Sequence, residues 1–162
     1  MLIVVSCVAG VCAFLPTKLC GDARGLLTCR SSTGSTGIII VDHGSRKKEA
    51  NDMLTDVALA YRHYAKAPIV EPAHMELAEP SIRAAYQRCV EQGATHIVCH
   101  PFFLAPGRHV QEDIPRLLCE AAGDHPGVTY SITAPLGLQE GIVQLIDSAV
   151  GEAVSSGTTP PP

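Results

Sequence analysis

Two apolar runs, each leading directly into a loop that carries a histidine, constrain this chain more than any other feature. The first run, 38–42, is followed at once by His43, and the second, 95–100, is followed by a loop rich in Pro and Gly that ends at His109. Continuous β-branched and apolar runs that do not alternate with polar residues are typical of strands buried on both faces. Ligands of open α/β sheets bind at the loops that follow such strands. Both histidines are therefore predicted to lie where a ligand would bind.

Strand and helix patterns alternate along the rest of the chain. The predicted strands are 38–42, 68–75, 95–100 and 128–133, and the predicted helices are 46–65, a segment opening at Glu79-Pro80, a segment after His109 and a segment from Leu138 to Ala149. Four strands, each followed by a helix, predict a single three-layer α/β domain with a four-stranded parallel sheet and flavodoxin-like winding. With strand order 2-1-3-4, His43 and His109 leave the sheet at its topological switch point.

Length and charge limit the classes of function. A chain of 162 residues is long enough for one domain with a sizeable core, and its 46% hydrophobic and 17% charged residues are typical of a globular protein. The 16 acidic residues outnumber the 12 lysines and arginines, and every acid except Asp22 lies beyond residue 36. A basic surface for nucleic acid or an anionic membrane is therefore not expected.

Residues 1–36 have the composition of a targeting presequence. An apolar run over 1–15 has the length of a signal sequence and is too short to span a bilayer, and the segment after it combines three basic residues with Ser, Thr and Gly. The junction Ala13-Phe14 resembles the cleavage site of bipartite presequences in algae with secondary plastids. We expect import into a plastid stroma, with a plain secretory signal as the alternative. The folded domain is then predicted at 37–153, followed by a disordered tail at 154–162.

The seven cysteines do not form a recognisable framework. Four lie in the first 30 residues, and Cys89, Cys99 and Cys119 are scattered over predicted helices and a strand. They contain no C-x-x-C pair, so we expect these three to be reduced and buried. Their distribution also disfavours the secretory alternative, because secreted domains of this size are often disulfide-bonded.

The polar residues of the predicted cleft favour a metal site. The chain has no G-x-G-x-x-G or Walker loop for phosphate, and Ser45 lacks the G-x-S-x-G elbow of a serine hydrolase. Neutral imidazole is the commonest ligand of first-row divalent metals. His43 and His109, with Glu76 after the second predicted strand as the carboxylate, would hold such an ion with open coordination positions.

Neighbouring residues are predicted to support this site. Asp42 is expected to cap or orient the first loop, and His74 and His100 lie near the cleft as possible orienting partners. Arg46 and Arg108 flank the two key histidines and are suited to bind a polyanion. The other histidines are predicted to be structural: His63, His96 and His125.

Three motifs in order carry a resemblance to a known family. They are VDHGSR at 41–46, VEPAHMELAEPSI at 70–82 and PFFLAPGRH at 101–109. Together they resemble the small class II chelatases, in particular the plastid sirohydrochlorin ferrochelatases, over about 37–150. HGSR alone would be unspecific, whereas three separate motifs in the same order are specific.

The resemblance implies insertion of Fe²⁺ into sirohydrochlorin to give sirohaem, the cofactor of plastid nitrite and sulfite reductases, with cobalt insertion on the cobalamin route as the alternative. His43 matches the metal ligand and proton acceptor, and His109 matches the second ligand. Glu76 and the loop ending at His109 match positions facing the macrocycle. We therefore expect a substrate-binding set that consists of Ser45, Arg46, Glu76, Leu104, Ala105, Pro106, Gly107 and Arg108, with Phe102 and Phe103 beside them.

Partners and cofactors follow from the same resemblance. The metal is a substrate, so no tightly bound cofactor is expected, and the C-terminal tail has no cysteine for the iron–sulfur segment of some plant relatives. The matching region is one lobe of larger two-lobed chelatases, which predicts a homodimer that closes the cleft. Two rivals remain: a metal-delivery protein without catalysis, and a tetrapyrrole-binding module indifferent to loss of both histidines.

Overall fold

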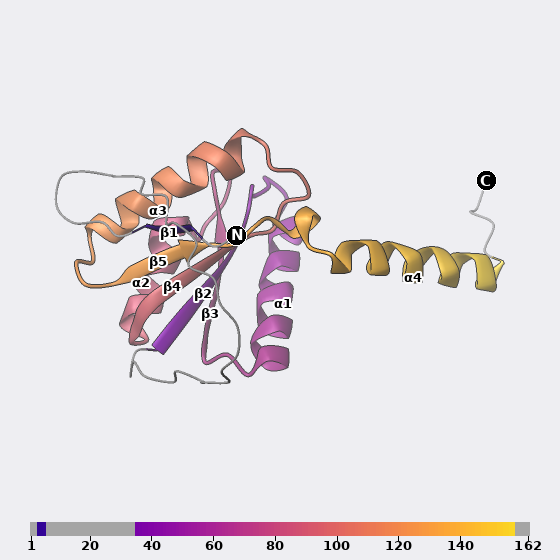
Figure 1. Cartoon of the computed structure of the whole chain (residues 1–162), viewed down its shortest axis with the longest axis horizontal. Coiled ribbons are helices and arrows are strands. Elements are labelled where there is room, and N and C mark those ends of the chain that lie inside the picture. Colours follow the sequence, from indigo (N-terminus) through magenta and orange to yellow (C-terminus); the bar gives the residue numbers. More distant parts are fainter. Residues whose placement is uncertain (1–2, 6–34, 158–162) are drawn as a thin grey trace, which may run out of the picture.

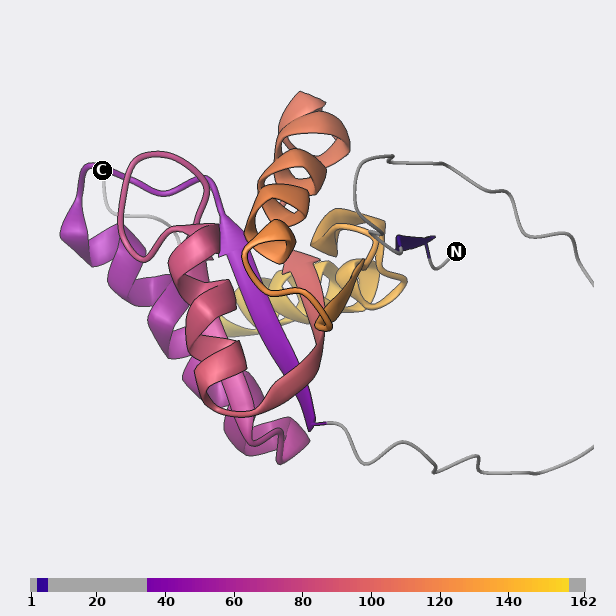
Figure 2. The same ribbon diagram turned by 90° about the vertical axis from the view of Figure 1, so that its left-hand side faces the viewer.

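The computed structural model describes residues 3–5 and 35–157, which form one sheet with helices on both faces (Figures 1 and 2). The strands are β1 (Ile3–Val5), β2 (Ser35–Asp42), β3 (Ile69–His74), β4 (Ala94–Pro101) and β5 (Thr129–Ile132). The helices are α1 (Lys48–Ala65), α2 (Ile82–Glu91), α3 (Ile114–Gly123) and α4 (Gly141–Ser156), with a π-helix η1 (His109–Asp113) and a 3-10 turn η2 (Leu136–Leu138).

The predicted parallel sheet is confirmed, including its strand order. The order is β1-β5-β4-β2-β3, in which β3, β2, β4 and β5 are parallel. In register, Asp42 lies opposite His74 and Val41 lies opposite Pro101, so the strands that carry the three motifs end at the same edge. The loops after β2, β3 and β4 consequently meet there.

One strand lies outside the predicted four. Ile3–Val5 form β1, which pairs antiparallel with β5 at the edge of the sheet. These residues belong to the segment predicted as a presequence, and residues 6–34 lie outside the described part of the chain, as do four of the cysteines. A sequence reading based on composition did not predict that part of this segment pairs with the sheet.

Two apolar clusters hold the layers together. The larger lies between the sheet and α2 with α3, and includes the buried Ile39, Tyr86 and Leu118. The smaller lies between the sheet and α1, around Leu54 and Ile40. Cys89 and Cys99 are buried free thiols, as predicted, and burial raises the pKa of the Cys89 thiol to about 12. Both clusters lie below the edge that carries the motif loops.

Some predicted boundaries were wrong in detail. Pro80 precedes α2, because the Ser81 side chain caps the helix by accepting the Ala84 N–H. Leu138 belongs to η2 rather than to the last helix, and α4 continues through Ser156 into the segment predicted as a disordered tail. The segment 158–162 lies outside the described residues.

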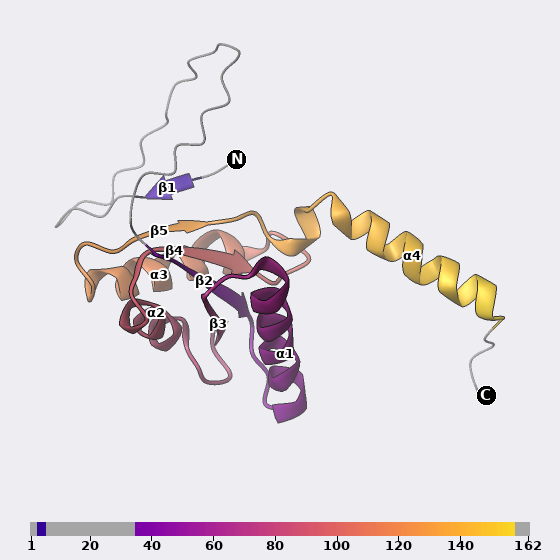
Figure 3. The same ribbon diagram turned by 90° about the horizontal axis from the view of Figure 1, so that it is seen from below.

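The last helix differs from the other three in its placement. Helices α1, α2 and α3 lie along the sheet, whereas α4 projects away from it with η2 at its base (Figures 1 and 3). No residue of α4 is buried. Among the described residues, no helix has both the length and the apolar character needed to cross a membrane.

Candidate functional site

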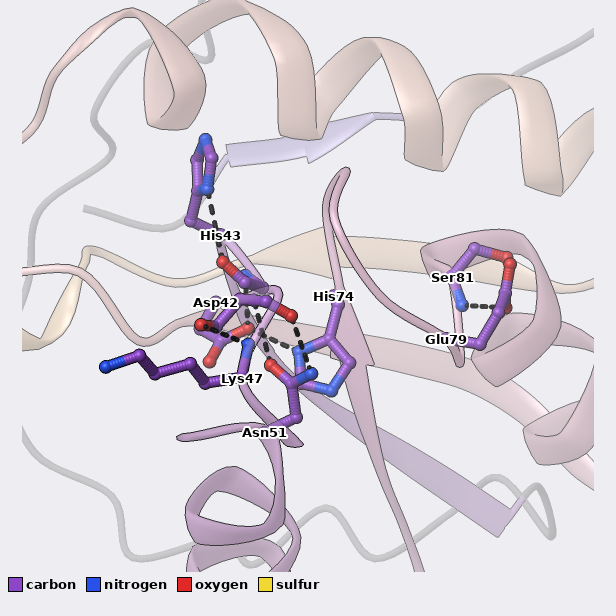
Figure 4. A network of polar contacts seen from close by, with 9 residues as sticks. Asp42, His43, Lys47, Asn51, His74, Glu79 and Ser81 are labelled. Carbon is purple, nitrogen blue, oxygen red and sulfur yellow. Dashed lines mark hydrogen bonds and ion pairs between the residues drawn. The ribbon is translucent and has the colours of Figure 1, made fainter. Parts of the chain in front are cut away.

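The loop after β2 presents His43, and two short hydrogen bonds determine its shape. Asp42 Oδ1 accepts the Gly44 N–H at 2.8 Å and lies 2.6 Å from Nδ1 of the buried His74 (Figure 4). Gly44 adopts a φ of +81°, which an L side chain rarely adopts. Asp42 therefore shapes this loop, as predicted, and His74 contacts Asp42; the role predicted for His74 in orienting a ligand stays a prediction.

The loop after β3 is attached to the His43 loop through the backbone. Met75 N–H donates to the Asp42 carbonyl at 2.9 Å, and Glu76 N–H donates to the His43 carbonyl at 3.3 Å. These bonds place the Glu76 carboxylate beside the imidazole, with Oε2 at 3.7 Å from His43 Nε2. The sheet register thus brings together two residues that are far apart in sequence.

His109 lies beside His43 and comes from the loop after β4, the other neighbour of β2 in the sheet. It opens the π-helix η1, whose wide turn is closed by the Ile114 N–H donating to the His109 carbonyl. The imidazole rings of His43 and His109 lie edge to face, with centroids 5.1 Å apart. The predicted convergence of the two histidines is therefore present in the structure.

Each histidine ring has its Nδ1 facing an acceptor. His109 Nδ1 lies 2.9 Å from Asp113 Oδ2, and His43 Nδ1 lies 3.4 Å from the Gly44 carbonyl. A ring that donates from Nδ1 is left with an unprotonated Nε2, which is the form that binds a metal or accepts a proton. Asp113 was not predicted from the sequence, although a helix was expected after His109 and Asp113 follows His109 at the i, i+4 spacing.

The site is open to solvent. The side chains of His43, Glu76 and His109 are 41%, 53% and 42% exposed. Within the described part of the chain, no three His, Cys, Asp or Glu side chains are grouped closely enough to hold a metal ion. The arrangement brings two imidazoles and one carboxylate to an accessible surface without forming a closed metal cage.

The other predicted substrate residues surround this centre unequally. Arg46 is exposed three residues after His43, and Ser45 has its Oγ occupied as acceptor of the Lys47 N–H at 3.1 Å. Arg108 is exposed and lies 3.3 Å from the Glu112 carboxylate. The loop Leu104, Ala105, Pro106, Gly107 and Arg108 is exposed throughout.

The two phenylalanines of this loop have a different role from the predicted one. Phe102 packs against the cluster under α1, and Phe103 packs against the cluster under α2 and α3, so both contribute to the core. Leu104, with 71% exposure, is the apolar side chain that the loop offers to a ligand. Phe102 N–H also donates to the Val41 carbonyl at 2.7 Å, which attaches this loop to the end of β2.

The remaining histidines are structural. His100 pairs with Thr133 Oγ1 at 2.7 Å, and burial lowers its pKa. His96 pairs with Thr129 and Ser131, and His125 stacks on Tyr86. His63 lies exposed on α1. These contacts agree with the structural roles predicted for His63, His96 and His125.

The fold and the site together define a small doubly wound α/β protein with a two-histidine, one-carboxylate centre at its switch point. The family model described as CbiX matches residues 37–153, and the chain belongs to the CbiX family.

Relatives with curated names are sirohydrochlorin chelatases. The chain is 46% identical to "Sirohydrochlorin ferrochelatase, chloroplastic" of Arabidopsis thaliana, over 83% of this chain and 60% of that protein. It is 33% identical to "Sirohydrochlorin cobaltochelatase" of Sulfurisphaera tokodaii, over 75% of this chain and 97% of that protein. The chain thus spans about three fifths of the chloroplastic relative and nearly all of the archaeal one.

A solved structure supports the same family. The sirohydrochlorin chelatase SirB from Bacillus subtilis subspecies spizizenii, crystallised in complex with cobalt, superimposes with a TM-score of 0.67 at 32% identity. The match covers 73% of this chain and 50% of that one. The matched part of this chain therefore corresponds to half of that protein.

Proposed function

We propose that this protein inserts Fe²⁺ into sirohydrochlorin, forming sirohaem and releasing two protons. The observation that carries the proposal is the pair of imidazoles 5.1 Å apart with the Glu76 carboxylate beside them, on an open surface at the sheet switch point. The 46% identity to a chloroplastic sirohydrochlorin ferrochelatase supports iron as the metal.

The reaction requires a base and a weak metal site in one place. Insertion removes the two pyrrole N–H protons of the macrocycle and transfers an ion that must lose its previous ligands. A centre that is about half exposed and not closed around an ion suits transient binding. We propose that His43 accepts a proton through Nε2 while His109 and Glu76 present the metal to one face of the ring.

The surroundings of the centre are suited to a flat polyanion. Sirohydrochlorin has many carboxylates, which the exposed Arg46 and Arg108 would bind through charge-assisted hydrogen bonds. The loop 104–108 would lie along the macrocycle, with Leu104 against its apolar surface. The side chain of Ser45 already accepts a backbone N–H, so its contribution to the substrate would be a further hydrogen bond.

An anaerobic absorbance assay tests the proposal directly. The full chain is mixed with sirohydrochlorin and Fe²⁺ or Co²⁺, beside the double variant His43→Ala, His109→Ala and the control His63→Ala on the exposed surface of α1. We expect the metalated spectrum with the native chain and the control, and a rate at least about 100-fold lower with the double variant. Equal rates for the native chain and the double variant would refute the role of the two histidines.

The same assay separates the alternatives. A faster reaction with Co²⁺ than with Fe²⁺ would favour a cobaltochelatase, which is what the archaeal relative is named. Metal binding without metalation would indicate a delivery protein. Macrocycle binding that survives loss of both histidines, again without metalation, would indicate a tetrapyrrole-binding module.

We propose that residues 1–36 direct the protein to a plastid, as the name of the chloroplastic relative supports, and that the mature protein forms a homodimer. Two copies would cover the open side of the cleft that a single lobe leaves exposed.

A further inference from the structure

Helix α4 exposes a complete apolar stripe. The stripe is defined by Ile142, Leu145, Ile146, Ala149, Val150 and Ala153. These positions follow the i, i+3, i+4, i+7 spacing of a helix that packs on one side. Leu145, Ile146 and Val150 are 65%, 58% and 55% exposed. A helix with such a stripe and no buried residue lacks a packing partner among the described residues of this copy.

The base of α4 holds the helix away from its own sheet. Gly137 N–H in η2 donates to the Phe103 carbonyl at 3.0 Å, and η2 is followed immediately by the start of α4. A Cβ on Gly137 would overlap the backbone of Leu104, so η2 is in close contact with this loop. The direction in which α4 leaves the body is therefore set by a contact with the loop before His109 (Figure 3).

Among the described residues, one half of a sheet face has no helix packed on it; this half-face is the α1 side of β4 and β5. Helices α2 and α3 cover one face, and α1 covers the other face only over β2 and β3. On the α1 side of β4 and β5, His96, Val98 and His100 are only partly buried and Thr129 is exposed, whereas Ser131 is buried. A helix that follows β5 would normally cover this region. Helix α4 has 16 residues and is about 24 Å long, which matches the length of the 8-residue strand β4, about 26 Å.

Helix α1 borders this half-face with an exposed apolar flank. The flank consists of Met53, Val57, Ala60, Tyr61 and Tyr64, again at helical spacing, and all are exposed except Val57, which is partly buried against the cluster under α1. Leu54 and Ala58 of α1 pack against the sheet, and the crossover from β2 through α1 to β3 is right-handed. Because of this geometry, the flank faces β4 and β5 rather than the outer side of β3. Met53 and Tyr64 are 53% and 88% exposed. An apolar helix lying over β4 and β5 would contact it.

We propose that two copies of this chain exchange their α4 helices. The stripe of one copy lies over β4 and β5 of the second copy, against the α1 flank, and the exchange is reciprocal about a two-fold axis. This specifies the surface of the proposed homodimer, and it does not depend on whether the protein inserts a metal. A stable dimer buries about 1,200–2,000 Å² in total, which the two reciprocal helix contacts would have to supply.

The charges of α4 favour a second copy over a membrane surface. Membrane-surface helices combine an apolar face with Lys and Arg on the polar face. The charged residues of α4 are Asp147 and Glu152, and it contains no basic residue. An anionic lipid surface would repel this helix, whereas the uncharged stripe fits the α1 flank.

The test measures the mass of the full chain by sedimentation at several concentrations. Two variants each place a charge in the proposed contact: Ile146→Glu in the stripe and Tyr64→Glu in the α1 flank. Two matched controls place the same charge on the opposite sides of the same helices: Gln144→Glu on α4 and Leu59→Glu on α1. Circular dichroism confirms that each variant is folded, which is expected because all four positions are exposed.

The expected result is a wild-type dimer, two dimeric controls, and dissociation constants at least about 30-fold higher for Ile146→Glu and Tyr64→Glu. A monomeric wild-type chain at tens of micromolar would overturn the proposal. The proposal would also be overturned if Ile146→Glu weakened the dimer and Tyr64→Glu did not, because α4 would then contact a surface other than the α1 flank. Since mass is read without activity, a failed exchange and a failed chelatase assay are distinguishable.

Discussion

At the scale of single residues, the carboxylate beneath His109 is as important as the histidine itself. Asp113 lies 2.9 Å from His109 Nδ1 and is 18% exposed, so it holds the ring in one orientation and one tautomer. Without this acceptor, the proton can move to Nε2, the nitrogen that faces the open side. If His109 binds the metal through Nε2, its function would therefore depend on Asp113.

We predict that Asp113→Asn lowers the rate of metalation and the affinity for Co²⁺ by about 10–100-fold. The amide can donate a hydrogen bond to Nδ1, which would stabilise the wrong tautomer. The matched control is Glu112→Gln, because Glu112 is 69% exposed and pairs with Arg108 on the surface. Co²⁺ titration and the chelatase assay measure both variants, and equal losses in the two would contradict a specific role for Asp113.

A second residue-scale prediction concerns stability against acid. Burial lowers the pKa of His100 from its ordinary value of 6.5, so the unfolded chain binds a proton more readily than the folded chain. This contribution to stability is complete above pH 6.5 and is lost as pH falls through the lower pKa of the folded state. We predict that His100→Gln reduces the loss of melting temperature between pH 7 and pH 5 by about 2–4 °C. The exposed His63→Gln should leave that loss unchanged.

At the scale of elements, the site depends on the close approach of two loops. Gly44 has a φ of +81°, and a Cβ there would lie 3.1 Å from His74 Cβ and 3.2 Å from the backbone nitrogens of Leu77 and Ala78. The hydrogen bonds from Met75 and Glu76 to the β2 loop require this proximity. Any side chain at Gly44 would separate His43 from Glu76.

We predict that Gly44→Ala destabilises the protein by about 1–2 kcal/mol and strongly reduces metalation. The control is Gly123→Ala at the end of α3, where a Cβ would meet no atom within 4 Å and φ is not positive. Urea unfolding measures the free energy, and the chelatase assay measures the rate. A Gly44→Ala protein with native stability and rate would show that the two loops can separate without consequence.

The strands and their order could be predicted from the sequence, whereas the Asp113 contact and the packing partner of α4 could not. Runs such as 38–42 are apolar because both faces are buried, so the strands, their order and the convergence of His43 with His109 were predictable. Asp113 was missed because its contact depends on the π-turn of η1, which no sequence signal marked. The stripe of α4 predicted a packed helix, yet periodicity does not specify which surface, or which copy, a helix packs against.

At the scale of the whole molecule, the proposed dimer and the proposed site would be coupled through η2. The bond from Gly137 N–H to the Phe103 carbonyl joins the base of α4 to the loop that leads to His109. If α4 is held by a second copy, the loop 104–108 is supported from outside its own domain. Loss of the dimer would then loosen the substrate loop even though the fold of each copy remains.

We predict that activity per chain falls when the protein is diluted below its dimer dissociation constant, by about 10-fold or more at full dissociation. Linking two copies covalently should remove this concentration dependence. The measurement is the initial rate of metalation over a dilution series, with sedimentation at the same concentrations. An activity per chain that stays constant while the dimer dissociates would show that one copy suffices.

The π-turn at η1 has a further consequence for how this protein can change over evolution. Each residue of a helix turns the chain by about 100°, and η1 holds one residue more per turn than α3 after it. Deleting one residue from 109–113 would let an ordinary helical turn form, and the ring of His109 would rotate away from His43. The fold would survive such a deletion while the two-histidine centre would not, so this short stretch should resist insertions and deletions more strictly than the surface loops around it.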